Sequence, residues 1–266
     1  MKTLFSVLGD PPVSDADIKA KPILLTMGQY STGKTTFIKA LLNGYEYPGM
    51  HIAAEMSTDN FISVLRGPTD DFIPGNALVN NTQLPFHSLK FAFGENFLQR
   101  FRGSFIAADE RNSTEILDDL IIIDTPGTLD GNEQNRNYNF AEAMGWFARR
   151  AALIIIFFDV NKMGVSTEMK SVLDVIQGNE EKIRIVFNKS DTVDERDLAG
   201  SLAGLRHNLA KGRIHFILLY YTINLSFRVD PTPHPSTQHF MEHWTLGHPE
   251  NSGFQGTLLT INGLVL

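Results

Sequence analysis

The sequence predicts an α/β fold in which helices cover both faces of a mostly parallel sheet. Short β-branched, apolar runs alternate along the chain with helical patterns, the order produced by parallel strands with crossover helices. These runs are almost continuously apolar, as expected of strands buried on both faces. Four strands are predicted: Ile23–Met27, Leu120–Ile123, Leu153–Phe158 and Ile183–Phe187.

Three helices are predicted between and beside these strands. One covers Thr36–Leu42, directly after the first strand. A second is capped by Ser166 and ended by Gly178, and its apolar positions recur at helical spacing. These positions are Met169, Val172, Leu173 and Ile176. A third has Phe140, Met144 and Phe147 on one face.

Composition limits the class of protein. The chain has 266 residues, enough for one or two domains, and 23 basic against 30 acidic residues give a net charge of −7. That sign argues against a nucleic-acid-binding protein. Cysteine is absent, which excludes disulfides and is compatible with the cytoplasm. No apolar run approaches the roughly 20 residues of a membrane-spanning helix.

Residue usage also suggests three segments. All lysines lie at or before Lys211, whereas five of the eight histidines and four prolines follow it. We therefore expect an N-terminal arm over 1–20, a domain over 21–211, and a tail of uncertain structure over 212–266.

The clearest chemical motif follows the first strand. Gly28-Gln-Tyr-Ser-Thr-Gly33-Lys34-Thr35 matches GxxxxGK[ST], the P-loop of nucleoside triphosphatases. Its glycines let backbone N–H groups turn toward phosphate oxygens, and the following helix adds its positive N-terminal end. Lys34 would reach the β- and γ-phosphates, and the Thr35 hydroxyl would bind Mg²⁺. The nucleotide-binding residues predicted here are Gly28, Gln29, Tyr30, Ser31, Thr32, Gly33, Lys34, Thr35 and Thr36.

Two further motifs follow the second and fourth strands. Asp124-Thr-Pro-Gly127 would place a carboxylate on Mg²⁺ and the Gly127 amide at the γ-phosphate. Alone it would be read as an ordinary turn. Asn188-Lys189-Ser190-Asp191 would read the base, with Asp191 accepting two N–H bonds from guanine while Asn188 and Lys189 brace the loop.

With these motifs in place, the sequence resembles the EH-domain-containing (EHD) proteins of the dynamin superfamily, which are ATP-binding membrane remodellers of endocytic recycling. The resemblance extends from about Asp15 to Lys211. Beyond the three motifs, it rests on Lys21-Pro22, Pro48-Gly49-Met50, Ser57-Thr58-Asp59, Phe61-Ile62, Pro74–Leu78, Pro85-Phe86, Phe93-Gly94, Phe97-Leu98, Arg100-Phe101, Trp146-Phe147-Ala148, Phe158-Asp159 and Lys182-Ile183-Arg184.

The resemblance implies a P-loop NTPase fold of the dynamin-type G domain and further site residues. Thr58 would be a switch threonine that meets Mg²⁺ and places the attacking water, so the predicted catalytic residues are Lys34, Thr58 and Gly127, and the predicted metal ligands are Thr35, Thr58 and Asp124. Pro85–Gly94 would be a loop used in oligomer contacts; alternatively it is a structural loop with Phe91 and Phe93 buried. The family implies ATP over GTP, although the Asn188–Asp191 motif suits guanine.

The expected function is therefore slow, Mg²⁺-dependent hydrolysis of a nucleoside triphosphate that switches membrane remodelling in endocytic recycling. The family's flanking helices and EH domain are not recognised, which suggests a truncated product. Self-association or full-length relatives are the expected partners, with peripheral endosomal or plasma-membrane contact only if such helices exist. The alternative is a module that binds nucleotide or relatives without hydrolysis. Tyr30 stands where dynamin-like GTPases have glutamine, and the P-loop offers no obvious general base.

The tail holds one other pattern. His239-Phe-Met-Glu242-His243 fits H-x-x-E-H, a zinc-hydrolase spacing. Prolines flank it and no suitable fold precedes it, so the sequence favours chance over zinc.

Overall fold

The structure, a computed structural model, describes residues 15–50, 60–109, 114–129, 136–162, 164–211 and 220–223. The described strands form one sheet in the order β3-β4-β2-β5-β1-β6-β7-β8. Its strands are β1 (Ile23–Gly28), β2 (Phe61–Gly67), β3 (Asp71–Pro74), β4 (Phe101–Ala107), β5 (Ile121–Asp124), β6 (Ala151–Asp159), β7 (Ile183–Asn188) and β8 (Tyr220–Ile223).

The sheet is mostly parallel, which confirms the predicted fold class. Antiparallel pairing occurs between β2 and β5 and between β3 and β4, while β5, β1, β6, β7 and β8 run parallel. The carboxyl ends of β1, β5, β6 and β7 therefore meet at one edge of the sheet. Ligands of open α/β sheets bind at this edge.

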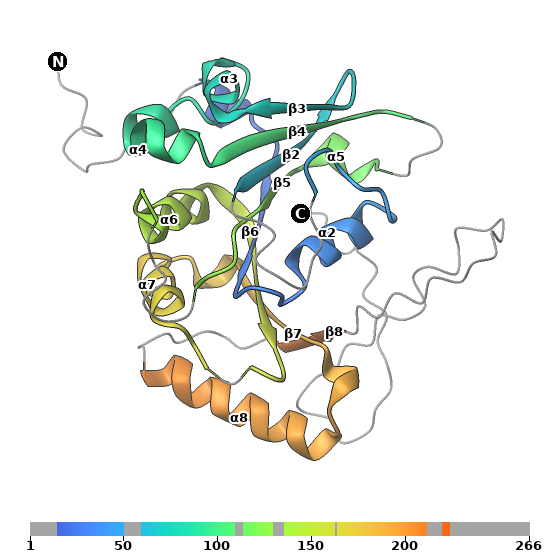
Figure 1. Ribbon diagram of the computed structural model, residues 1–266, viewed down its shortest axis with the longest axis vertical. Coiled ribbons are helices and arrows are strands. Elements are labelled where there is room, and N and C mark those ends of the chain that lie inside the picture. The colour runs from blue at the N-terminus through green and yellow to red at the C-terminus, as the bar shows by residue number, and fades with distance from the viewer. Residues whose placement is uncertain are drawn as a thin grey trace.

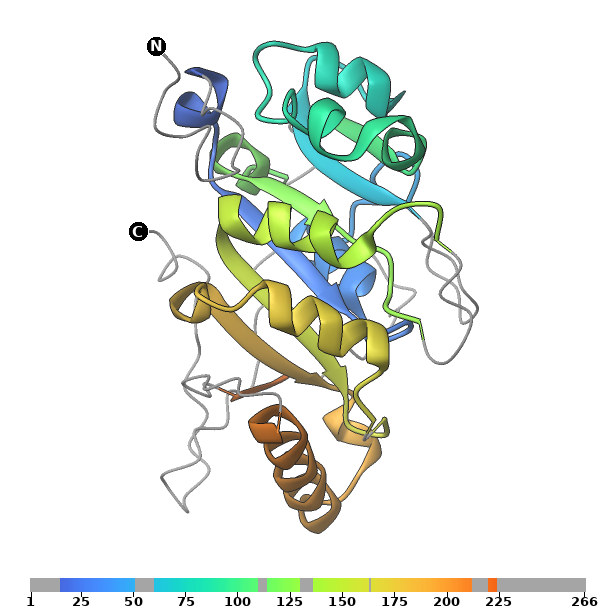
Figure 2. The same ribbon diagram turned by 90° about the vertical axis from the view of Figure 1, so that its left-hand side faces the viewer.

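Helices lie on both faces (Figures 1 and 2). One face is covered by α6 and α7, with α3 and α4 near its end, and the other by α2. The described helices are α1 (Asp15–Lys19), α2 (Lys34–Leu41), α3 (Gly75–Asn80), α4 (Leu89–Leu98), α5 (Ile116–Asp119), α6 (Phe140–Arg150), α7 (Thr167–Val175) and α8 (Glu195–Lys211), with 3₁₀ turns η3 (Glu180–Lys182) and η4 (Ser190–Thr192).

Alternation along β1 shows how the two cores arise. Leu25 and Met27 belong to the cluster beneath α6 and α7, whereas Leu24 packs with Phe37 and Ile38 of α2. Side chains of a strand point to opposite faces in turn, so a fully apolar strand supplies both layers. Burial of both layers fixes the strand ends that carry the three motifs.

The predicted elements are present, with small shifts. The Ser166 hydroxyl accepts a 3.1 Å hydrogen bond from the Met169 amide at the start of α7, and Gly178 adopts φ +87° in the turn after that helix. The first residue of β5 is Ile121 rather than Leu120. Among the described helices, none has the length and apolarity to cross a bilayer.

Four strands were not predicted. Strands β2 and β4 contain Ser63, Arg66, Arg102 and Gly103, which interrupt their apolar runs. Strand β3 has only four residues. Strand β8 lies in the segment assigned to the tail, yet it pairs with β7, so the sheet continues past Lys211, the last residue of α8.

Candidate functional site

The P-loop connects β1 to α2, as its motif predicts. Gly28 adopts φ +152°, and a Cβ there would lie 2.4 Å from the carbonyl oxygen of Phe157 on β6. Only glycine fits so close to the neighbouring strand. Gly33, with φ +96°, precedes the first turn of α2. Ser31 also has a positive φ of 61°. The loop thus turns tightly at the carboxyl edge of the sheet.

Lys34 is buried and folds back over this loop. Its ammonium donates hydrogen bonds to the carbonyl oxygens of Gly28 at 3.2 Å and Gln29 at 2.8 Å. Burial lowers the pKa of Lys34 to about 8, opposed by the negative charge of Asp124. The ammonium group therefore lies in a buried environment of low dielectric constant, where electrostatic interactions are strong.

Asp124, at the end of β5, meets the P-loop helix. Its Oδ2 accepts hydrogen bonds from the Thr35 hydroxyl at 2.8 Å and from the Tyr47 hydroxyl at 2.6 Å. Burial raises the pKa of Asp124, while the bond from Tyr47 and the charge of Lys34 act in the opposite direction. Tyr47 itself is buried, which raises its pKa well above the ordinary value. Sequence reasoning missed Tyr47, because it belongs to no motif.

The oxygen atoms of Thr35 and Asp124 fit a magnesium ion. Asp124 Oδ1 is buried and has no hydrogen-bond partner among the described residues. A hydroxyl and a carboxylate are hard oxygen ligands of the kind Mg²⁺ takes alongside phosphates and water. The arrangement therefore offers two of the three predicted metal ligands at one place. Thr58, the third, lies outside the described residues.

Gly127 lies directly against the P-loop. A Cβ at Gly127 would come within 2.7 Å of the Cα and amide nitrogen of Tyr30, so this position also requires glycine. The next residue continues the contact, because the Thr128 amide donates to the Gly28 carbonyl oxygen at 3.1 Å. The segment predicted to sense the γ-phosphate is thus packed on the loop predicted to hold it.

A buried ion pair fastens the other side of this segment. Arg136 donates to Glu168 Oε1 at 2.9 Å and to the Gly127 carbonyl oxygen at 2.7 Å. Glu168, in the first turn of α7, also accepts the Leu129 amide at 2.7 Å. The Arg136 guanidinium lies 4.1 Å from the ring centroid of Phe140. Arg136 and Glu168 were missed because their partners come together only in the fold.

The predicted base-reading loop follows β7. Asn188 is buried, and its side-chain amide donates to the Thr32 carbonyl oxygen at 2.9 Å. This bond joins the loop to the P-loop across the sheet edge. Lys189 adopts a left-handed conformation with φ 63°. Asp191 is exposed in η4, so its carboxylate is open to solvent.

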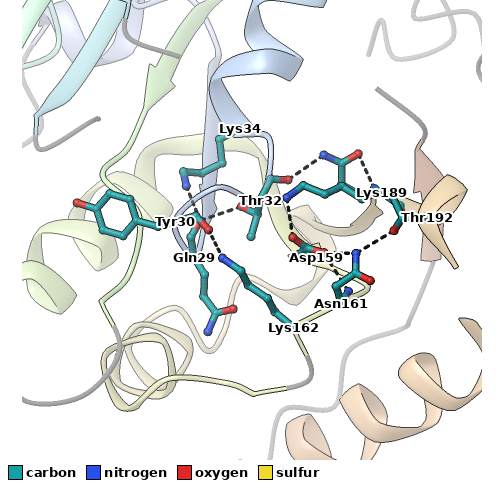
Figure 3. A network of polar contacts seen from close by, with 10 residues as sticks. Gln29, Tyr30, Thr32, Lys34, Asp159, Asn161, Lys162, Lys189 and Thr192 are labelled. Atoms are coloured by element: carbon teal, nitrogen blue, oxygen red, sulfur yellow. Dashed lines mark hydrogen bonds and ion pairs between the residues drawn. The ribbon is translucent and has the colours of Figure 1, made fainter. Parts of the chain in front are cut away.

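Asp159, at the end of β6, anchors this loop (Figure 3). Its Oδ2 accepts the Lys189 ammonium at 2.7 Å, and its Oδ1 accepts the Asn161 amide at 2.9 Å. The side chain of Asn161 donates to the Thr192 hydroxyl at 2.8 Å. Burial tends to raise the pKa of Asp159, but the bonds from Lys189 and Asn161 outweigh it and hold that pKa below its usual value. A carboxylate directly after a predicted strand was the available signal for this residue.

Three other predictions concern Thr36, the segment Pro85–Gly94 and the His239–His243 pattern. Thr36 lies in α2, one residue after Thr35. In Pro85–Gly94, Phe86 is fully buried, but Phe91 is 74% exposed. The alternative in which Phe91 and Phe93 are both buried is therefore wrong for Phe91, whereas Phe93 is partly buried and packs against the core. The His239–His243 pattern lies outside the described residues.

Comparison with known proteins identifies the family of the chain. The Dynamin family profile matches residues 24–190, from β1 to Ser190 after β7. The chain belongs to the dynamin family. This dynamin-family chain is 43% identical over 209 residues to human EH domain-containing protein 1 and 40% identical to EH domain-containing protein 2 of Arabidopsis thaliana. Each match covers 78% of the chain. The resemblance inferred from the motifs is confirmed.

The matches cover only part of the relatives. The dynamin-family chain spans 38% of the human protein and 37% of the Arabidopsis protein. It is also similar to a chain of an oligomerised bacterial dynamin pair, with 14% identity and a TM-score of 0.49, over 79% of this chain and 40% of that chain. The family assignment rests on the sequence matches and concerns the nucleotide-binding domain.

Proposed function

We propose that this chain binds a nucleoside triphosphate with Mg²⁺ and slowly hydrolyses its β–γ phosphoanhydride bond. The observation that carries the proposal is the 2.8 Å hydrogen bond from the Thr35 hydroxyl to Asp124. It joins the end of the P-loop to the end of β5 beside the buried Lys34. Phosphoryl transfer depends mainly on positioning and charge neutralisation. A site that brings one ammonium and two Mg²⁺ ligands to a tight loop supplies both.

The chain's own residues divide the work. The P-loop amides from Gly28 to Thr35 bind the phosphates, and Lys34 neutralises charge on the β- and γ-phosphates. Thr35 and Asp124 would hold Mg²⁺, with Thr58 as the proposed third ligand. Bound there, the ion would supply charge neutralisation at the phosphates. The Gly127 amide would contact the γ-phosphate, so that presence of this phosphate fixes the segment from Asp124 to Leu129.

The preferred base is proposed to be adenine. The likeness to EH domain-containing proteins supports ATP over GTP, whereas the carboxylate of Asp191 favours guanine. Asp191 is exposed in η4, where its carboxylate is open to solvent. Nucleotide-dependent self-association, peripheral contact with endosomal or plasma membranes, and a switch role in membrane remodelling and endocytic recycling belong to the same proposal and rest on family membership.

The decisive experiment measures phosphate release from ATP and from GTP, with and without Mg²⁺. Lys34→Ala is compared with wild type, and Lys39→Ala is the matched control, because Lys39 lies on the same helix and pairs with Glu46 instead of the P-loop. We expect Mg²⁺-dependent release that falls about 10²-fold in Lys34→Ala and is unchanged in Lys39→Ala. Equal release by wild type and Lys34→Ala would overturn the proposal.

Calorimetry with the same proteins distinguishes the alternative function. A module that binds nucleotide as an assembly partner without hydrolysis would show saturable binding to ATP and no phosphate release, even beside liposomes. Thermal unfolding without nucleotide shows whether Lys34→Ala folds. Nucleotide should raise the unfolding temperature of wild type through mass action and leave that of a folded Lys34→Ala nearly unchanged.

A further inference from the structure

A second lysine approaches the P-loop from the opposite side to Lys34. Lys162, in the connection between β6 and α7, donates a 2.9 Å hydrogen bond to the carbonyl oxygen of Tyr30. Figure 3 shows the ends of both lysine side chains directed at the same turn of the loop. Together the two ammonium groups contact three successive carbonyl oxygens, those of Gly28, Gln29 and Tyr30. None of the three motifs includes Lys162.

The hydrogen bonds of Lys34 and Lys162 differ from those of two neighbouring lysines, although the negative charge of Asp124 also acts on Lys34. Lys189 pairs with Asp159 and Lys39 with Glu46. In the part of the chain that the structure describes, Lys34 and Lys162 are hydrogen-bonded to neutral carbonyl oxygens. Their charges repel, since Lys162 adds to the effect of burial in lowering the pKa of Lys34. Two neighbouring ammonium groups over one loop are balanced best by a polyanion.

The contact with Tyr30 indicates which phosphate of a bound triphosphate would lie nearest Lys162. The backbone of Tyr30 is the part of the P-loop on which Gly127 packs. Gly127 is the residue proposed to contact the γ-phosphate, so Lys162 lies at the γ end of the loop. Lys162 is exposed, and its flexible side chain can move by the length of a hydrogen bond from a carbonyl oxygen to a phosphate oxygen.

We propose that Lys162 is a catalytic residue of this chain, a cation supplied in cis to the β–γ end of the bound triphosphate. This inference rests on the proposed hydrolase function. During hydrolysis the water oxygen bonds to the γ-phosphorus as the bond to the β–γ bridging oxygen breaks. The bridging oxygen leaves with the electron pair, and the proton of the water ends on inorganic phosphate. Lys162 donates a hydrogen bond to the oxygens that gain charge and transfers no proton, as an arginine finger does.

The test compares Lys162→Gln and Lys162→Arg with wild type. Glutamine keeps an N–H donor for the Tyr30 carbonyl oxygen but has no charge, whereas arginine keeps the charge. Lys170→Gln is the matched control, because Lys170 is exposed on α7. The substitution removes the same charge from a nearby position. All four proteins should unfold at nearly the same temperature without nucleotide, since exposed substitutions change stability little.

We expect Lys162→Gln to lower kcat for ATP at least about tenfold, with a smaller change in KM. By calorimetry it should also lose affinity for a non-hydrolysable ATP analogue and keep its affinity for ADP. Lys162→Arg should restore most of both properties, and Lys170→Gln should match wild type.

Two results would overturn the inference while the hydrolase function stands. In one, Lys162→Gln keeps the wild-type kcat and the wild-type ratio of triphosphate to diphosphate affinity. In the other, arginine and glutamine impair both equally, which would make Lys162 a structural tie to the P-loop. If wild type releases no phosphate, the hydrolase function falls first and the catalytic role falls with it.

Discussion

The proposed nucleotide site has a phosphate end, around the P-loop Gly28–Thr35, and a base end, around Asn188–Asp191, and the two ends hold their charges in different ways. At the phosphate end Lys34 and Asp124 are buried, and the side chains of Arg136 and Glu168 are only 7% and 8% exposed. At the base end the Lys189 side chain is 37% exposed and Asp191 is open to solvent. Asp159 is buried there and pairs with Lys189.

The contrast implies that the phosphate end affects the stability of the fold, whereas the base end affects which nucleotide binds. Buried charges are costly to leave unpaired, so the phosphate end ties its chemistry to the stability of the fold. Solvated charges are screened and contribute little to stability. The connection between β6 and α7 joins the two ends, since it begins at Asp159, carries Lys162 and reaches Glu168. Substitutions at the phosphate end should therefore change stability most, and those at the base end should change nucleotide preference.

The largest effect is expected from Arg136→Leu. It leaves the buried Glu168 carboxylate without its cation and should lower the free energy of unfolding by about 3–5 kcal/mol. Urea denaturation measures this loss. The double variant with Glu168→Leu should recover part of it, because apolar side chains can replace a buried ion pair. A loss below about 1 kcal/mol for Arg136→Leu would show that this end does not depend on its buried charges.

A pH titration should reveal the buried charge of Lys34. Because its pKa is lowered to about 8 in the folded protein and is about 10.4 when unfolded, the folded state releases its proton first as pH rises. The unfolded state then binds more protons, and stability increases with pH. Between pH 7.5 and 9.5 we expect a gain of about 2 kcal/mol over the Lys34→Met variant, which cannot titrate. Urea denaturation at each pH gives the free energy of unfolding. If this free energy changes with pH in the same way for both proteins, the expectation is wrong.

The ion pair of the base end should contribute less. Asp159→Asn removes the partner of the half-exposed Lys189 and should cost about 1–2 kcal/mol of stability. The pKa of Asp159 is lowered in the folded protein. Its contribution is therefore present above the unfolded pKa of about 3.9 and is lost as pH falls through the lower, folded pKa. The free energies of unfolding of wild type and Asp159→Asn should become equal only under acid conditions. If wild type remains more stable in acid, this ion pair is not the cause of the difference.

The sequence predicts some strands of this fold and not others. Strands β1, β5, β6 and β7 were predictable because both of their faces are apolar, and β1, β5 and β7 each place a motif at the sheet edge. Strand β4 was not, because Arg102, Gly103 and Ser104 interrupt its pattern and only packing explains them; Leu78 fills the space beside Gly103.

The supporting residues of the site were hidden for a related reason. Tyr47 and Asp124 are 77 residues apart in the sequence, and Arg136 and Glu168 are 32 apart. Motifs describe residues that are close in sequence, whereas these pairs depend on which helix packs beside which strand. Asp159 was not predicted either, but it had a local signal, since it follows a predicted strand in the same way as Asp124.

The smallest effect on stability, and the largest on base preference, is expected from Asp191→Asn. Because Asp191 is exposed, the substitution should change the free energy of unfolding by less than about 0.5 kcal/mol. A carboxylate accepts two N–H bonds from guanine, whereas asparagine offers one acceptor and one donor, a pattern that matches adenine. Affinity for GTP should therefore fall about tenfold, as expected for loss of one hydrogen bond to a charged group, while affinity for ATP is kept or improved. Calorimetry with both nucleotides measures this, with Asp197→Asn, at an exposed position of α8, as the control. If both nucleotides lose affinity equally, Asp191 supports the loop and does not read the base, and selection between adenine and guanine must come from another part of the chain.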